Sequence, residues 1–246
     1  MKDATVSTPA LVFRAVAKSF GKQVVLADLN LEVERGEALG LVGVNGAGKT
    51  TLLRALLDLA RPDSGSIEIF GSPAHQARAR AHLSYLAERF NPPGFASGLE
   101  LLRYLLALHG QHLDVAEAQA EAVALDLEPA ALARPVRQYS KGMAQKLGLI
   151  ACILARRPLL VLDEPMSGLD PRARALFKRR LAAHKAAGVT LFFSTHFLAD
   201  VEALCDRIAV LDGGRVVFVG APAALLEQQR ADTLEEAFLS CLGAPA

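Results

Sequence analysis

The chain has 246 residues, enough for one large α/β domain or for a core domain that carries an inserted subdomain. Hydrophobic residues make up 52% of the sequence and charged residues 22%, a globular profile that argues against disorder. The net charge is +1 and no Lys/Arg block is interleaved with aromatic residues, so we expect no nucleic-acid partner.

No apolar stretch is long enough to cross a bilayer, since residues 147–155 make up about half of the roughly 20 residues that a membrane helix needs. The first residues contain an acid and lack the apolar run of a signal peptide, so we expect a cytoplasmic protein. Cys152, Cys205 and Cys241 are far apart and have no C-x-x-C spacing. We therefore predict neither a structural zinc site nor a disulfide.

Two alternating runs of apolar and polar residues, at 11–17 and 24–33, are joined by a turn at Gly21 and Lys22. They predict an N-terminal antiparallel β unit. Phe20, directly before the turn, is either an aromatic platform for a purine or a core side chain. The local pattern fits both interpretations.

The stretch GVNGAGKTT at residues 43–51 matches the phosphate-loop pattern G-x-x-x-x-G-K-[ST] and follows an apolar run at 38–42. Its glycines let the backbone curl so that N–H groups converge on phosphate oxygens. Apolar residues at 52–57 continue at helical spacing, so the loop lies at a helix N-terminus, which favours an anion. Lys49 is expected at the β- and γ-phosphates and Thr50 at Mg²⁺. The predicted ATP-binding residues of this loop are Gly43, Asn45, Gly46, Ala47, Gly48, Lys49, Thr50 and Thr51.

Strand patterns follow at residues 66–70 and 83–86, and then the character of the chain changes. After a break at Pro92-Pro93-Gly94, leucines recur at helical spacing from 99 to 108. Asp114 is a candidate cap for a second helix to about residue 125, and a third helical pattern covers 145–154. These segments predict a helical insertion.

Ser140 and Gly142 precede the third of these helices. A hydroxyl and open N–H groups at a helix N-terminus suit an anion, as they do in the phosphate loop. An ordinary N-cap serine has the same pattern. The phosphate loop elsewhere in the chain favours the anion-binding interpretation.

The apolar run at residues 159–162 predicts a strand buried on both faces, and Asp163 and Glu164 follow it directly. Sites of α/β proteins lie at the carboxyl ends of parallel strands, so these carboxylates should meet the phosphate loop. Asp163 is predicted to hold Mg²⁺ through its water shell. Glu164 is predicted to polarise an attacking water as general base.

A second buried run at 189–193 ends at Ser194-Thr195-His196. A lone histidine is usually structural, but a strand end that matches that of Asp163 favours a donor to the γ-phosphate. Between the two runs, a turn at 167–171 leads into a helix, and the five cations between residues 172 and 180 are expected to form a solvated face.

A hairpin at residues 208–219 turns at Asp212-Gly213-Gly214, and two short helices at 222–229 and 234–242 close the chain. No linker or repeat separates a second domain. We therefore predict a single domain over residues 1–246.

In this order the motifs resemble those of the ATPase subunit of ATP-binding cassette (ABC) transporters over essentially the whole chain. The matching features are an aromatic in the adenine-stacking position (Phe20), the phosphate loop, the signature segment YSKGM at 139–143 in place of the commoner LSGGQ, LLVLDEP at 159–165, SGLD at 167–170 and the switch histidine (His196). The resemblance implies an α/β P-loop NTPase fold with a mixed sheet. Residues 1–90 and 155–246 would form a RecA-like core with the antiparallel β unit, and about 91–154 an inserted α-helical subdomain.

The resemblance also implies a head-to-tail dimer, made of two identical copies or of this chain and a related cassette. Each ATP would lie between the phosphate loop of one subunit and Ser140, Lys141 and Gly142 of the other. Ser167 and Asp170 are assigned to the same site. The helical subdomain would contact a separate transmembrane permease at the cytoplasmic face of the membrane, without direct contact with the transported substrate.

Two departures from the family pattern bear on activity. Glu88 occupies the position of a Gln that contacts Mg²⁺ and the attacking water, and a carboxylate is a Mg²⁺ ligand, so we expect activity with altered metal dependence. Lys141 and Met143 replace a Gly and a Gln of the signature, and Lys141 would bring a cation near the partner's γ-phosphate. This combination resembles the branch that serves ABC-2 type permeases, mostly exporters.

The resemblance assigns Glu164 to activate water, His196 and Lys49 to stabilise charge on the transferred phosphoryl group, and Asp163 with Thr50 to hold Mg²⁺. The alternative is a soluble ABC ATPase without a pump, such as an iron-sulfur assembly ATPase, which would co-purify with a soluble scaffold. A small-molecule P-loop kinase would leave residues 139–143 and 167–170 without a role.

Overall fold

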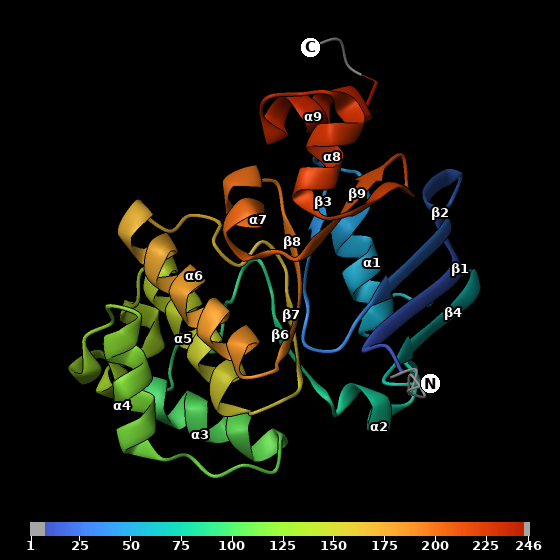
Figure 1. Cartoon of the computed structure of the whole chain (residues 1–246). Helices are drawn as coiled ribbons and strands as arrows, with labels where there is room; N and C mark the ends of the chain where they lie inside the picture. The colour runs from blue at the N-terminus through green and yellow to red at the C-terminus, as the bar shows by residue number, and fades with distance from the viewer. Residues whose placement is uncertain (1–7, 244–246) are drawn as a thin grey trace, which may run out of the picture.

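The structure is a computed structural model that describes residues 8–243. Its strands form a four-stranded sheet in the order β2-β1-β4-β5 and a six-stranded sheet in the order β10-β9-β3-β8-β7-β6. Helix α1 lies between the two sheets, and helices α3 to α6 gather on the other side of the six-stranded sheet (Figure 1). The predicted α/β class, with a mixed sheet and an antiparallel unit, is confirmed.

The four-stranded sheet is the predicted antiparallel unit. In it β1 (Leu11–Phe20) pairs antiparallel with β2 (Gln23–Val33) and with β4 (Ser64–Ile69), and β5 (Ser72–Pro73) extends β4 at the edge. Alternate residues of β1 and β2 point to one face, where Leu11, Phe13 and Leu29 are fully or almost fully buried. This apolar face packs on α1 (Lys49–Leu56) in one core cluster.

The six-stranded sheet brings distant segments of the chain to one edge. Strands β3 (Ala38–Val42), β7 (Leu159–Leu162) and β8 (Thr190–Thr195) are buried at every residue, as parallel strands covered on both faces should be. Strand β6 (Leu83–Leu86) runs parallel to β7, and β9 (Arg207–Asp212) runs parallel to β3. Strand β10 (Arg215–Gly220) pairs antiparallel with β9. The carboxyl ends of β3, β6, β7 and β8 therefore lie side by side.

Three longer helices lie in the segment predicted to be helical. Helix α3 (Gly98–Leu108) starts at a capping box formed by Ser97 and Glu100, and α4 (Val115–Ala124) is capped by Asp114, as predicted. Helix α5 (Lys141–Leu154) starts four residues before the predicted 145, because Ser140 caps it. Short 3₁₀ turns, η1 (Pro129–Ala133) and η2 (Val136–Gln138), precede α5.

Two of the remaining helices were not predicted. These are α2 (Ala77–Arg80) and α7 (Leu198–Leu204), each too short to show a clear helical period. The others, α6 (Pro171–Ala186), α8 (Pro222–Gln229) and α9 (Leu234–Cys241), lie where the sequence predicted them. The hairpin turn between β9 and β10 is also as predicted, with positive φ angles of 50° and 77° at Gly213 and Gly214.

The prediction of a solvated cationic face on α6 is wrong for three of its five cations. Arg174 and Lys178 point at the carboxylate of Asp200, which is 1% exposed, and Arg180 binds the buried Glu121 of α4. Both acids lie on helices that pack against α6 and need opposite charge where water is excluded. Asp200 and Glu121 are distant in the sequence from the cations that they bind, so the local pattern of α6 could not show these ion pairs.

Among residues 8–243, no helix is long and apolar enough to cross a membrane. Cys152, Cys205 and Cys241 are free thiols, and burial raises the pKa of Cys152 to about 12.

Candidate active site

A cavity of about 430 Å³ opens where the phosphate loop meets the carboxyl ends of β7 and β8. It brings together most of the side chains that the sequence predicted for one side of an ATP site. The predicted residues that line it are Asn45, Gly46, Gly48, Lys49, Thr50, Thr51, Glu88, Glu164, Ser167 and His196. Gln23 and Val25 of β2, which were not predicted, complete the lining.

The glycines of the phosphate loop are required by its shape. Gly46 and Gly48 have φ angles of 86° and 112°, where side-chain-bearing residues are strained. A Cβ at Gly48 would lie 2.8 Å from the carbonyl oxygen of Val25, and one at Gly43 would lie 2.5 Å from that of Leu211. The loop is therefore pressed against β2 and β9 and can curl only without side chains.

Lys49 lies inside the loop that carries it. Its ammonium donates to the carbonyl oxygens of Gly43 and Val44, at 2.6 and 3.2 Å, and lies 3.7 Å from Glu164 Oε1. Burial lowers the pKa of Lys49, and the nearby carboxylates of Glu164 and Asp163 oppose that shift. The loop thus holds a desolvated cation beside its N–H groups, a strong site for a phosphate oxygen.

Asp163 is 2% exposed and directly precedes Glu164, which lines the cavity. It accepts a hydrogen bond of 2.6 Å from the Ser194 hydroxyl. Burial raises the pKa of Asp163, and the charges of Glu164 and Glu88 add to the rise, while the hydrogen bond from Ser194 and the nearby Thr50 hydroxyl oppose it. The side chain thus sits in an environment that favours bringing a cation close.

Ser194 is a site residue that the sequence analysis did not assign. Its hydroxyl donates to Asp163 and accepts the Glu164 N–H at 2.9 Å, so one buried side chain holds both acids. Strand β8 extends two residues past its predicted end, which places Ser194 inside the sheet. A serine directly after a buried apolar run was the available signal, since a buried hydroxyl needs partners.

Glu164 and His196 form a direct pair. His196 Nδ1 lies 2.8 Å from Glu164 Oε2, and the His196 side chain is 42% exposed. When Glu164 is ionised, Nδ1 must carry the proton, so a neutral His196 presents an unprotonated Nε2. Glu164 also has a φ angle of 43°, a left-handed conformation that is unusual for this residue type.

Three oxygen-bearing side chains predicted to hold Mg²⁺ lie close together. Thr50 and Glu88 line the cavity, and the nearby Thr50 hydroxyl and the charge of Glu88 both act on the pKa of Asp163. Hydroxyl and carboxylate oxygens are the ligands that Mg²⁺ prefers, so these residues fit the ion. Among residues 8–243 no group of three or more His, Cys, Asp or Glu side chains could hold a metal on its own. Substrate phosphates and water would therefore complete the shell.

Ser140 and Lys141, two residues of the second predicted set, line a separate cavity of about 550 Å³ with Arg89 and Phe90. Ser140 is the N-cap of α5 and accepts the Met143 N–H at 3.2 Å, as the ordinary-cap interpretation predicted. The Lys141 ammonium lies 3.0 Å from where a Cβ would stand on Gly168. One chain therefore does not bring these residues to its own phosphate loop.

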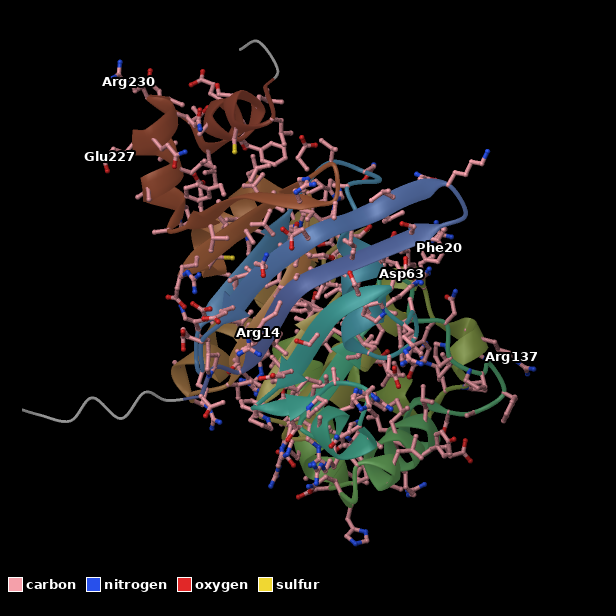
Figure 2. All side chains as sticks on the ribbon, turned by 90° about the vertical axis from the view of Figure 1, so that its right-hand side faces the viewer. Arg14, Phe20, Asp63, Arg137, Glu227 and Arg230 are labelled. Carbon is pink, nitrogen blue, oxygen red and sulfur yellow. The ribbon has the colours of Figure 1, made fainter. Side chains whose placement is uncertain are left out.

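Asp170 and Phe20 also lie outside the lining of the phosphate-loop cavity. The Asp170 carboxylate caps α6 by accepting the Ala173 N–H at 2.9 Å. Phe20 is 52% exposed at the end of β1, with the Lys18 ammonium 5.3 Å from its ring centre (Figure 2). The core interpretation of Phe20 is therefore wrong, and its open ring face is compatible with a stacked base.

Gln145 is a second residue that sequence analysis did not place in the site. It is 1% exposed in α5, and its amide donates to the carbonyl oxygens of Ala87 and Pro165, at 3.4 and 3.3 Å. These carbonyls neighbour Glu88 and Glu164. Gln145 thus links the helix of the signature segment to both acidic strand ends.

A family model described as "ABC transporter" matches residues 26–167. Among curated proteins, a "Nod factor export ATP-binding protein I" of Cupriavidus pinatubonensis is 40% identical over 228 residues, which cover 90% of this chain and 69% of the relative.

Solved structures give the same result. One described as the ATP-binding subunit of an ABC transporter superposes with a TM-score of 0.86 at 31% identity, covering 94% of this chain and 99% of that chain. A bacterial ABC transporter cassette, described as dimeric, superposes with a TM-score of 0.79. It covers 86% of this chain and 98% of that chain at 20% identity, which supports the fold alone.

Proposed function

Because this chain belongs to the ABC transporter family, as an ATP-binding and ATP-hydrolysing subunit, we propose that it works in a head-to-tail pair of cassettes that close on MgATP and drive an exporter permease. The pair contains two copies of this chain or this chain and a related cassette. Each ATP lies between the phosphate loop of one subunit and residues 140–142 of the other. The division into a core and a helical subdomain at about 91–154 is part of this proposal.

One observation carries the proposal: the predicted ATP-binding residues fall into two groups that a single chain does not join. Lys49, Glu164 and His196 share one cavity, whereas Ser140 and Lys141 line another. Ser140 is exposed at the start of α5, where its hydroxyl and the free N–H groups of the helix can receive an anion. A second cassette that presents this helix start to the phosphate loop completes the site. The bacterial cassette compared above, described as dimeric, is consistent with this arrangement.

The residues in and around the phosphate-loop cavity have distinct roles in binding and hydrolysis. The loop N–H groups and Lys49 bind the β- and γ-phosphates, and Phe20 stacks on the adenine. Thr50, Asp163 and Glu88 would hold Mg²⁺, which neutralises charge on the phosphates when it is bound. Glu164 takes the proton of the attacking water. Glu164 must first release its contacts with His196 and Lys49, because both occupy its carboxylate oxygens. Once released, His196 carries its proton on Nε2 and donates a hydrogen bond from it to the γ-phosphate, which stabilises the charge on the transferred phosphoryl group.

The permease lies outside this chain, and the cassette docks on its cytoplasmic side through the helices of about residues 91–154. The relatives reported above are transport proteins, which favours a transporter subunit over a soluble assembly ATPase. The Cupriavidus relative is named for Nod factor export, and we extend from it only the direction of transport. The cargo is determined by the permease, since the cassette does not touch it.

Replacement of Glu164 by Gln tests the proposal. We expect turnover to fall by about 10²- to 10⁴-fold, while MgATP still binds and a dimer accumulates. Steady-state ATPase assays and light scattering after size-exclusion chromatography measure the two effects. A variant that hydrolysed ATP at the parental rate would show that Glu164 is not the base.

A matched pair of serine variants tests the second half of the site. In the Glu164→Gln background, Ser140→Tyr should keep the protein monomeric with MgATP, because the bulky ring blocks the start of α5. Ser66→Tyr, at an exposed position of β4, should leave the dimer intact. If Ser140→Tyr dimerised as well as Ser66→Tyr, the assignment of residues 140–142 to the partner's ATP would be wrong.

A further inference from the structure

A charged cluster between α6 and α7 lies behind the histidine of the active site. Asp200 of α7 is 1% exposed, and two cations of α6 converge on its carboxylate. Arg174 Nε lies 3.8 Å from one oxygen and Lys178 Nζ lies 3.3 Å from the other. Within the described residues, neither carboxylate oxygen nor Arg174 Nε makes a hydrogen bond. Charge attraction therefore holds α7 against α6 here.

The Arg174 guanidinium extends this cluster toward the site. Its carbon lies 3.9 Å from the centre of the Phe197 ring, within the range of a cation–π contact. The Phe197 ring lies 4.0 Å from the His196 imidazole, centre to centre, with an angle of 38° between the planes. His196 in turn contacts Glu164. Arg174, Phe197 and His196 thus form one continuous stack that ends at the proposed base.

The stack restricts the orientation of the His196 imidazole. His196 follows the last residue of β8 and is 42% exposed, so burial alone does not restrict its rotamers. The Phe197 ring covers one face of the imidazole, and the Phe197 N–H donates to Thr195 Oγ1 at 3.0 Å, which fixes the backbone at this position. An imidazole held in place before ATP arrives needs less reorganisation during catalysis.

We propose that Phe197 and Arg174 are positioning residues for His196. Arg174, anchored by Asp200, holds the Phe197 ring, and the ring holds the imidazole in the orientation from which it meets the γ-phosphate. This inference rests on the proposed role of His196 in hydrolysis. Neither Arg174 nor Phe197 lines the phosphate-loop cavity, so the expected effect is on kcat rather than on ATP binding.

Kinetics of Phe197 variants test the inference. Phe197→Leu should lower kcat by about 10- to 100-fold, the usual effect of misplacing a reacting group, and should leave KM for ATP nearly unchanged. Phe197→Tyr retains the ring and should restore most of the activity. Arg174→Gln should lower kcat less than Phe197→Leu. Arg179→Gln is the matched control, because Arg179 is exposed on the same helix, and it should not change kcat.

A double-mutant cycle with His196→Ala separates positioning from general damage. Phe197→Leu should have no further effect once His196 is absent, because it acts only through the imidazole. An undiminished loss in the His196→Ala background would overturn the inference, and so would parental kcat in Phe197→Leu when His196→Ala is slow. Parental kcat in His196→Ala would instead show that the proposed role of His196 is wrong. If Phe197→Leu does not fold, equal kcat for Arg174→Gln and Arg179→Gln overturns the inference.

Discussion

The two halves of the proposed ATP site differ in how completely one chain builds them. Around the phosphate loop, Lys49, Asp163 and Ser194 are each less than a tenth exposed. Lys49 donates to the carbonyl of Gly43, and Ser194 of β8 donates to Asp163 at the end of β7. At the signature segment, Ser140 and Lys141 are exposed; Ser140 caps α5, and the Lys141 side chain lies against Gly168. In the buried half, a substitution that removes a catalytic contact also destabilises the fold. In the exposed half, a substitution changes the free energy of unfolding little.

Two glycines test this difference with the largest expected effect. Gly48→Ala forces a side chain into a φ of 112° and against the Val25 carbonyl. We therefore expect the free energy of unfolding to fall by about 3 kcal/mol and ATP binding to be lost. In Gly142→Ala the new Cβ meets ordinary contacts, with Leu169 at 3.6 Å, and unfolding should be unaffected. Denaturant unfolding and nucleotide titration measure both variants. Equal destabilisation would contradict the contrast between the halves.

Two serines sharpen the comparison with a smaller effect. Ser194→Ala leaves the buried Asp163 carboxylate and the Glu164 N–H without a partner, and we expect it to cost about 2 kcal/mol. Ser140→Ala removes only a helix cap and should cost about 1 kcal/mol or less. Thermal unfolding without nucleotide distinguishes them. A Ser194 variant no less stable than the Ser140 variant would argue against the buried network.

The pH dependence of stability tests the charge of Asp163. Its folded pKa lies above the ordinary 3.8, so the ionised carboxylate reduces stability at neutral pH, and this penalty disappears as pH falls through the raised pKa. Asp163→Asn should therefore unfold about 2–4 °C higher than the parent at neutral pH, as a gain of about 1 kcal/mol would produce. The difference should vanish on acidification to pH values near 3.8.

Magnesium provides the control for this prediction. Added Mg²⁺ with ATP should stabilise the parent more than Asp163→Asn, because the variant loses a carboxylate that favours the ion. Thermal unfolding measured across pH, with and without MgATP, tests both the pH dependence and the effect of magnesium. A variant less stable than the parent at neutral pH, or one stabilised equally by MgATP, would contradict the assignment.

Gln145 connects the two halves, and its loss should have the smallest effect. Its hydrogen bonds to Ala87 and Pro165 are long, at 3.4 and 3.3 Å, so Gln145→Leu should change unfolding free energy by about 1 kcal/mol or less. ATP affinity of the phosphate loop should remain parental, while MgATP-driven dimerisation weakens. Calorimetric ATP binding and light scattering separate these outcomes. Weakened ATP binding with intact dimerisation would show that Gln145 supports the phosphate-loop half of the site alone.

The sequence predicted the phosphate loop, the acids after β7 and the histidine after β8 because each is a local pattern, readable from glycine spacing or from an apolar run of strand length. Buried parallel strands also leave few alternatives for where their ends lie. The short α7 could not be predicted, since its seven residues contain too few turns to establish a period.

By itself, the sequence determined the α/β class and predicted most of the residues that line the phosphate-loop cavity, because motifs and strand ends are local properties of the chain. The tertiary structure alone decided that Ser194 joins both acids, that Asp200 faces Arg174 and Lys178, and that Phe197 backs His196. Those contacts depend on how separate elements pack, and burial creates the need for each partner only after the elements have come together.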